Sequence, residues 1–127
     1  MTPDPSPAHA ARWFDPRARS AGSLAFILNR LTGLGLTIYL ALHLVVLGKL
    51  AQGPQAYDDF VAFSGSPLIK TAEVVLIFGV LFHGLNGLRL TMHALGIGVR
   101  AQKTWFLAVM VITLLASLWF ALHLFTV

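Results

Sequence analysis

Three long apolar segments constrain the fold of this chain more than any other feature of its sequence. They span residues at about 22–50, 67–97 and 104–127. Each can supply the ~20 residues that a helix needs to cross a bilayer. The hydrocarbon core offers no hydrogen-bond partners. The backbone N–H and C=O groups of segments this long must therefore bond to one another, as they do in a helix. The sequence therefore predicts an all-α membrane protein with three transmembrane helices.

The composition agrees with this fold class and excludes several others. Of the 127 residues, 57% are hydrophobic and only 11% are charged, whereas soluble domains carry about a quarter charged residues. The net charge is +4, but the basic residues cluster at the ends of the apolar segments, so we expect no nucleic-acid binding. The absence of cysteine excludes thiolate metal sites and cysteine-ligated clusters within this chain.

The basic residues also predict a topology. One side of the membrane would carry Arg12, Arg17, Arg19, Arg30, Arg89, Arg100 and Lys103, and the other only Lys49 and Lys70. The positive-inside rule then places the N-terminus and a second loop at 96–103 inside, and a first loop at 51–66 and the C-terminus outside. We divide the chain into an N-terminal segment, residues 1–20, interpreted as interfacial or as a disordered tail, and a three-helix anchor domain, residues 21–127.

His83 is the most unusual residue of the second segment. It would lie about 18 Å from the inner end near Leu95, at 1.5 Å per residue. Gly79 and Gly87 lie four residues before and after it, on the same helix face. One interpretation is a core histidine beside glycines that allow close helix packing. The other is an axial haem ligand, with the glycines leaving room for the macrocycle.

Other polar residues in the apolar segments have two interpretations each. Arg30 and Arg89 either extend to the inner interface or meet an anionic group, and Arg89 would suit a haem propionate. His43 shares a helix face with Tyr39, four residues earlier, and is either an interfacial histidine or the ligand of a second haem. His93 and His123 are expected near the two interfaces, and His9 lies in the N-terminal segment.

Two motifs resemble the cytochrome b membrane-anchor subunit of succinate dehydrogenase (succinate–quinone oxidoreductase, complex II). ILNRLTGLGL, residues 27–36, is similar to the family's first-helix segment, in which a His-Arg or similar pair precedes Ser/Thr-Gly. FHGLNGLRL, residues 82–90, is similar to the second-helix motif H-x-x-x-G-x-R. The resemblance, including the three-helix layout, covers roughly residues 20–127.

This resemblance implies that His83 is an axial ligand of haem b, with the opposing histidine supplied by a second membrane-anchor subunit. Arg30 would lie near a ubiquinone or menaquinone site, and Arg89 would support the propionate side. Electrons would arrive from an iron–sulfur subunit on the inner face, and a flavoprotein subunit would oxidise succinate or reduce fumarate. The chain would be a multi-pass protein of the cytoplasmic membrane, packed with its partner into a helix bundle.

The chain departs from the family pattern at three places. Leu90 stands where the motif often has His, and Phe26 stands where a quinone-contacting Ser is often found. Ser23, one turn earlier, is the substitute we consider for that contact. His43 lies where two-haem members place a first-helix ligand, which favours a second haem.

No set of nucleophile, base and acid is evident, and we expect no catalytic residue for succinate in this chain. The acidic residues lie only in the N-terminal segment, the first loop and a helix end: Asp4, Asp15, Asp58, Asp59 and Glu73. Two alternative functions are a haem-free structural anchor and a small transporter subunit. The second would need a continuous polar face, and the third segment offers only Thr113 and Ser117.

Overall fold

A computed structural model describes residues 21–127, so the expectations for residues 1–20 and for His9 lie outside the described residues. Four α-helices follow one another: α2 (Ala21–Leu50), α3 (Pro54–Ser64), α4 (Pro67–Ala94) and α5 (Gln102–Thr126), with a 3-10 turn, η2 (Val99–Ala101), before α5. Three of these segments are long and apolar enough to cross a membrane. The predicted all-α membrane protein with three spanning helices is confirmed.

Local residues set the boundaries of α4. Ser66 caps its start by accepting a hydrogen bond from the backbone N–H of Ile69, and Pro67 occupies the first turn, where a missing N–H costs nothing. The helix ends at Ala94, three residues before the predicted end at 97. The helix ends here because Gly96 has a φ of +81°, a value that glycine adopts readily but that is incompatible with an α-helix. α5 begins at Gln102, two residues before the predicted start.

The first loop, predicted over 51–66, is mostly helical, and this part of the prediction was wrong. α3 begins directly after Gly53, whose φ is +124°. Its Pro54 stands in the first turn, where proline favours a helix. Gln55 Nε2 donates a hydrogen bond to Asp59 one turn later, at 3.0 Å. The Gly-Pro pair therefore marks the start of a helix, although it is also typical of a loop.

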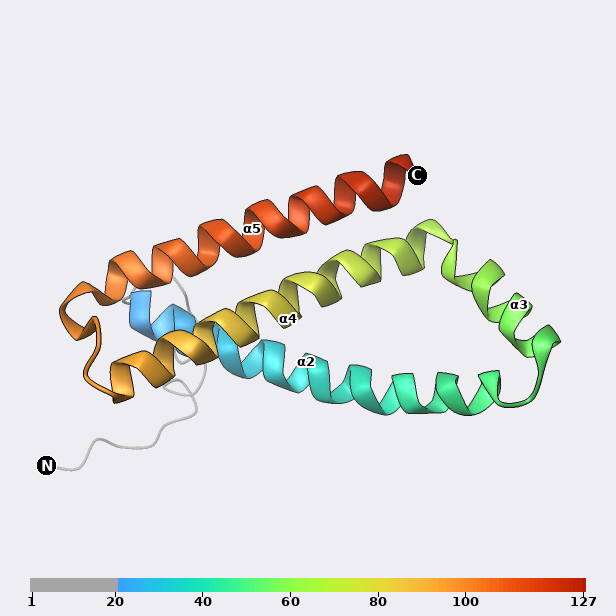
Figure 1. Cartoon of the computed structure of the whole chain (residues 1–127), viewed down its shortest axis with the longest axis horizontal. Coiled ribbons are helices and arrows are strands. Elements are labelled where there is room, and N and C mark those ends of the chain that lie inside the picture. The colour runs from blue at the N-terminus through green and yellow to red at the C-terminus, as the bar shows by residue number, and fades with distance from the viewer. Residues whose placement is uncertain (1–20) are drawn as a thin grey trace, which may run out of the picture.

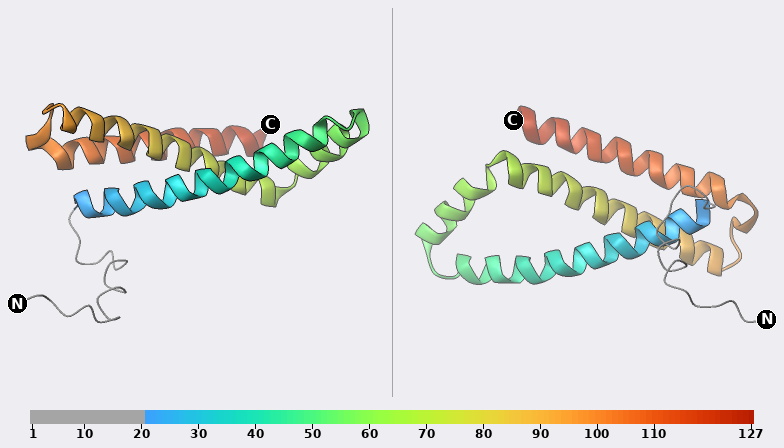
Figure 2. Two further views of the ribbon diagram at one scale, coloured as in Figure 1. Left: turned by 90° about the horizontal axis from the view of Figure 1, so that it is seen from below. Right: turned by 180° about the vertical axis from the view of Figure 1, so that it is seen from behind.

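The helices form an open bundle (Figure 1). α4 and α5 run side by side in opposite directions, and α2 crosses α4 near the start of α2. From the crossing, α2 and α4 diverge until α3 joins their far ends. Seen from below, the start of α2 lies apart from α4 and α5, and further along α2 and α4 overlap in this view (Figure 2).

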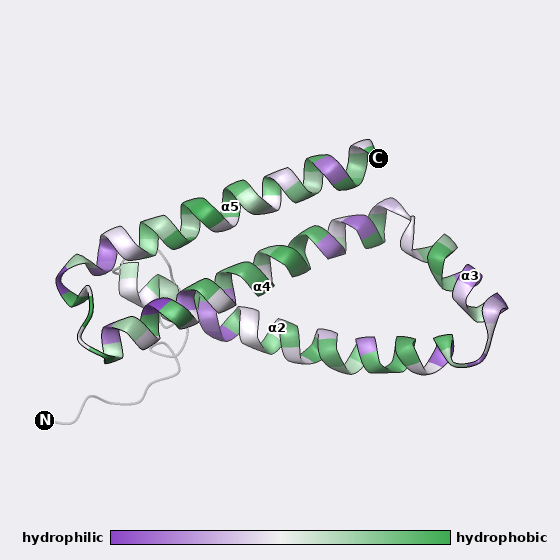
Figure 3. Cartoon of the chain, in the orientation of Figure 1, coloured by the Kyte–Doolittle hydropathy of each residue, from purple (hydrophilic) through white to green (hydrophobic). Residues whose placement is uncertain are grey.

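Hydropathy is arranged the opposite way from that of a soluble protein. Hydrophobic residues predominate along α2, α4 and α5 (Figure 3), and many of their large apolar side chains are exposed. The buried apolar residues of the described chain are Ala25, Phe82 and Val109. The buried polar residues are Asn86, Arg89, Thr113 and Ser117. Polar groups inside and apolar groups outside are what a helix bundle in lipid requires.

Candidate functional site

His83 points from α4 onto the backbone of α2 at the helix crossing. Its Nδ1 lies 3.1 Å from the backbone oxygen of Asn29 and 3.2 Å from Oγ1 of Thr32. The Thr32 hydroxyl donates to the carbonyl of Leu28, at 2.7 Å. The ring of His83 is thus fixed by two groups of a different transmembrane helix.

These contacts define the tautomer of His83. A carbonyl oxygen only accepts hydrogen bonds, so Nδ1 must carry the proton and donate it to Asn29. Nε2 then keeps its lone pair. Nε2 has no hydrogen-bond partner among residues 21–127, and it is not fully buried. A histidine with one nitrogen donating to a carbonyl and the other free is arranged as metal-ligating histidines are.

The close approach of the His83 ring depends on Gly33. A Cβ atom added at Gly33 would lie 2.9 Å from Cε1 of His83, too close for an ordinary contact. At Gly79 and Gly87, the glycines predicted to leave room beside His83, an added Cβ would meet nothing within 4 Å. The glycine that accommodates the imidazole therefore lies on α2, while the two on α4 face open space.

A chain of hydrogen bonds continues from this crossing into the bundle. Asn86 Nδ2 donates to Oδ1 of Asn29, at 3.1 Å, and Asn86 Oδ1 accepts from Nε of Arg89, at 3.0 Å. Asn86 is completely buried. We call these three residues the Asn29–Asn86–Arg89 network. It accounts for the polar side chain at 86 as a link between α2 and α4.

Arg89 is held between α4 and α5 rather than extended to an interface. It is only 5% exposed, its Nη1 donates to the backbone oxygen of Gln102 at 3.5 Å, and its guanidinium lies 5.7 Å from the ring centre of Phe106. The third guanidinium nitrogen of Arg89, Nη2, has no hydrogen bond to residues 21–127. Arg89 is therefore able to offer one further donor to an acceptor that reaches it.

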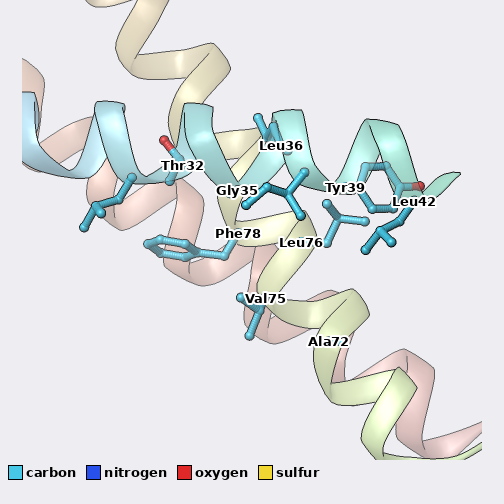
Figure 4. Close-up of a pocket in the computed structure, with 12 residues that line it drawn as sticks. Thr32, Gly35, Leu36, Tyr39, Leu42, Ala72, Val75, Leu76 and Phe78 are labelled. Atoms are coloured by element: carbon cyan, nitrogen blue, oxygen red, sulfur yellow. The ribbon is translucent and has the colours of Figure 1, made fainter. Parts of the chain in front are cut away.

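Two cavities flank the crossing. The first, of about 390 Å³, is an apolar groove between α2 and α4 (Figure 4). We call it the α2–α4 groove, and it is lined by Leu31, Thr32, Gly35, Leu36, Ile38, Tyr39, Leu42, Ala72, Val75, Leu76, Phe78 and Gly79. Thr32 connects it with His83, because its hydroxyl lies against Nδ1 of the imidazole. Gly79 belongs to this lining and Gly87 does not.

The second cavity, of about 290 Å³, lies on the other side of the crossing. We call it the Arg89 pocket, and its lining residues are Gly22, Phe26, Asn29, Arg89, Leu90, His93 and Gln102. It brings together four polar residues from three helices: Asn29 of α2, Arg89 and His93 of α4, and Gln102 of α5. His93 contributes an Nε2 atom that is sealed from solvent and has no hydrogen-bond partner among the described residues.

The residues expected near a quinone line neither cavity. Arg30 is exposed on α2, and its guanidinium lies 4.7 Å from the ring centre of Phe26. Ser23 lies seven residues before Arg30, so the two share one face of α2. Phe26, which stands where the family often has Ser, contacts both Arg30 and the Arg89 pocket. Ser23, Phe26 and Arg30 therefore lie together on α2, and the exposed side chain of Arg30 is able to contact a group outside this chain.

His43 lies apart from His83, near the end of α2 that leads to α3. Its ring stacks on Tyr39 with centroids 5.3 Å apart, and its Nδ1 lies 3.3 Å from the Tyr39 hydroxyl. Tyr39 and Gly35 line the α2–α4 groove. His123 makes a similar stack with Trp119 on α5, with centroids 5.9 Å apart. In the part of the chain that is described, no three metal-ligating side chains gather at one place.

The donor set around His83 fits one side of a haem. The imidazole has a free Nε2, a carbonyl acceptor on Nδ1 and an apolar groove beginning at Thr32. A haem iron with two axial histidines needs only one such residue from each of two chains, so a cluster of three ligands is not required. The residues present therefore fit the group that the motifs imply.

Sequence reasoning missed the residues on α2 that support His83, namely Asn29, Thr32 and Gly33. Each belongs to the NRLTG stretch, whose conspicuous member is Arg30. The only signal was that a polar residue and a small residue stand close together in an apolar segment. Their pairing with His83 depends on how α2 and α4 cross, which the spacing within one helix does not reveal.

Comparisons with known proteins agree with the motifs. The profile of the family described as "Succinate dehydrogenase/Fumarate reductase transmembrane subunit" matches residues 9–122. The chain is 37% identical over 95 residues to a succinate dehydrogenase hydrophobic membrane anchor subunit of Halobacterium salinarum, covering 74% of this chain and 73% of that relative. It is 30% identical over 71 residues to the succinate dehydrogenase 2 membrane subunit SdhC of Mycobacterium tuberculosis, covering 56% and 52%.

Proposed function

The chain belongs to the succinate dehydrogenase/fumarate reductase transmembrane subunit family, as a membrane-anchor subunit of succinate dehydrogenase, and on that premise we propose that it binds haem b through His83. It would pass electrons from the iron–sulfur subunit to a membrane quinone. The observation that carries this proposal is the hydrogen bond from Nδ1 of His83 to the backbone oxygen of Asn29, at 3.1 Å. It leaves Nε2 as the free ligand atom and fixes the plane of the ring.

When bound between two imidazoles, haem b supplies a one-electron relay inside the low-dielectric bilayer. The residues of this chain hold and orient it. His83 presents Nε2, Gly33 admits the ring to the backbone of α2, and the α2–α4 groove offers an apolar wall.

Arg89 is proposed to stabilise the propionate side of this group. Its guanidinium is desolvated, and it retains one nitrogen without a hydrogen bond to the described residues. A carboxylate that reached this nitrogen would form a charge-assisted hydrogen bond in a dry environment. Such a bond would compensate for the cost of burying the arginine charge.

The quinone site is proposed to form at the exposed face of α2 that carries Arg30 and Ser23, with Phe26 between them. Arg30 has its charged group on the surface of this chain, where a donor could meet a quinone oxygen. Most of the site would come from other subunits, because neither residue lines the α2–α4 groove or the Arg89 pocket. The proposed partners are a second anchor subunit that supplies the opposing histidine, an iron–sulfur subunit and a flavoprotein subunit.

A second haem at His43 is the further candidate. It is favoured by the stack of His43 on Tyr39 and by the Gly35 and Tyr39 side chains in the groove wall. The hydrogen bond between Tyr39 and Nδ1 of His43, at 3.3 Å, would orient this imidazole as Asn29 orients that of His83. Its second ligand would also come from the partner anchor.

Spectroscopy of the purified complex tests the proposal against the haem-free structural anchor. The complex, with all its subunits, is measured oxidised and after reduction by dithionite or by succinate. We expect a b-type difference band, reducible by succinate. A complex that is intact and active with a soluble dye but shows no such band would make the chain a haem-free anchor. For the second haem, His43→Ala should halve the haem content, whereas an unchanged content would refute it.

A further inference from the structure

Asn86 has no role in the function proposed above, yet it is completely buried at the centre of the polar interior. Among residues 21–127 it is the side chain that links that of Asn29 on α2 to that of Arg89 on α4. A buried amide in a membrane helix is costly unless its groups are paired, and both its Oδ1 and its Nδ2 are paired here.

The orientation of the Asn86 amide follows from its neighbours. Arg89 has donors and no acceptor, so the group that faces its Nε must be Oδ1 of Asn86. Nδ2 of Asn86 is thereby directed at Asn29, and Asn29 must present its Oδ1 to receive it. The charge of Arg89 thus sets the direction of two successive amides.

Asn29 links the two oriented amides to His83. Its side chain is held by Asn86, and its backbone oxygen accepts the Nδ1–H of His83. Holding the side chain of Asn29 against α4 also holds this carbonyl at the imidazole. A hydrogen bond from Nδ1, the nitrogen that does not bind the metal, to a fixed acceptor makes a ligating histidine more basic, and a more basic ligand stabilises the oxidised metal.

We propose that Asn86 is a positioning residue that sets the reduction potential of the haem at His83, acting through Asn29 on one side and Arg89 on the other. This inference rests on the proposed function. In this proposal Asn86, which does not bind the iron, adjusts the reduction potential of the haem. The proposal also predicts opposite effects for two substitutions at the same position.

Asn86→Ala removes both hydrogen bonds and loosens the Asn29 carbonyl, so the midpoint potential of the haem should rise. Asn86→Asp keeps an acceptor for Arg89, turns the Asn29 amide around and adds a negative charge, so the potential should fall. The Ala variant carries the test, because the charge of Asp lowers the potential of a nearby haem in any case, whereas a residue that only packs the bundle would leave the potential of Asn86→Ala unchanged. Thr113→Val is the matched control, because Thr113 is equally buried but its hydroxyl has no hydrogen-bond partner among the described residues.

The experiment is a spectroelectrochemical titration of the haem in the purified four-subunit complex. Asn29→Ala, which keeps the backbone carbonyl, is measured alone and combined with Asn86→Ala. We expect Asn29→Ala to raise the potential as Asn86→Ala does. The double variant should shift no further than Asn86→Ala alone, because Asn86→Ala already removes the bond that Asn29→Ala breaks. If Asn86→Ala fails to assemble, Asn29→Ala still gives the predicted rise or refutes it.

The outcomes separate this inference from the function on which it rests. Haem present at unchanged potential in Asn86→Ala, shifts of the same sign in Asn86→Ala and Asn86→Asp, or additive shifts in the double variant would overturn the role of Asn86 alone. A wild-type complex without a b-type haem would overturn the proposed function and the role of Asn86 together. A shift of the haem potential in Thr113→Val as large as that in Asn86→Ala would also reject the role of Asn86.

Discussion

Gly33 shows how a single missing side chain determines the geometry around His83. The imidazole approaches the α2 backbone so closely that a Cβ at residue 33 would stand 2.9 Å from Cε1. The same residue brings Nδ1 within reach of Asn29 and Thr32. Glycine is needed at this position for the close approach, not for its backbone freedom.

We therefore expect Gly33→Ala to displace the ring and weaken its hydrogen bond to Asn29. Loss of a partner of this kind typically lowers affinity for the bound group by about tenfold or more. Haem retained by the purified complex after detergent washing measures this effect. Gly35→Ala is the matched control, because nothing lies within 4 Å of a Cβ added there. Equal haem retention in the two variants would contradict the role given to Gly33.

At the same scale, the sequence identified His83, Arg89 and the glycines around them, but not the partners of His83. Residues 79, 83 and 87 share a face by helix periodicity, which is readable from spacing alone. The approach of Asn29 and Gly33 depends on the crossing of two helices. No single-helix pattern contains that information, so the support of the imidazole became visible only in three dimensions.

Among the elements, the three spanning helices were predictable, and α3 was not. Long uncharged segments have only one stable backbone structure in lipid. The sequence therefore predicted that these segments are helices, and their ends differ from the predicted ones by at most three residues. α3 is short and contains proline, glycine and two aspartates, which are typical of loops. Its helical state depends on Pro54 standing in the first turn, a positional detail that composition does not show.

The free end of α5 depends on one long-range contact. Lys70, in the first turn of α4, donates from Nζ to the backbone oxygen of Leu124 at 3.1 Å and lies 5.9 Å from the ring centre of Phe125. The last carbonyls of a helix have no partner within it, and a cation near that end also interacts favourably with the helix dipole.

We expect Lys70→Met to destabilise this end of the bundle by about 1 kcal/mol, the usual contribution of one such hydrogen bond. The thermal midpoint of the purified complex should fall by a few degrees. Lys49→Met is the control, since the Lys49 side chain is exposed and makes no hydrogen bond to residues 21–127. A midpoint that falls equally in both variants would show that the loss of charge, and not the contact with Leu124, is responsible.

For the whole molecule, the arrangement of polar groups inside and apolar groups outside ties the fold to a bilayer and to a partner. Asn86, Arg89, Thr113 and Ser117 are buried, while large apolar side chains remain exposed along all three spanning helices. Lipid and contacts with other subunits of the complex are the environments in which such a surface is stable. Composition predicted this class, but which polar side chains face inward required the structure.

The orientation in the membrane is a prediction of the charge distribution, and the chain suits a direct test. It contains no cysteine, so a single introduced thiol reports only its own position. Asp58→Cys on α3 should react with a membrane-impermeant maleimide in intact right-side-out vesicles. Lys103→Cys at the start of α5 should react only in inverted vesicles. Both residues are exposed, and the reverse pattern of labelling would refute the predicted topology.

The most direct test of the whole account is the haem b content per complex in His83→Ala, measured beside His123→Ala as the matched control. His123 is exposed on α5 and stacks on Trp119, far along the chain from the Asn29–Asn86–Arg89 network. The account predicts that His83→Ala loses the haem that His83 holds, with the subunits still co-purifying, while His123→Ala keeps the wild-type content. Full haem retention in an assembled His83→Ala complex would contradict it.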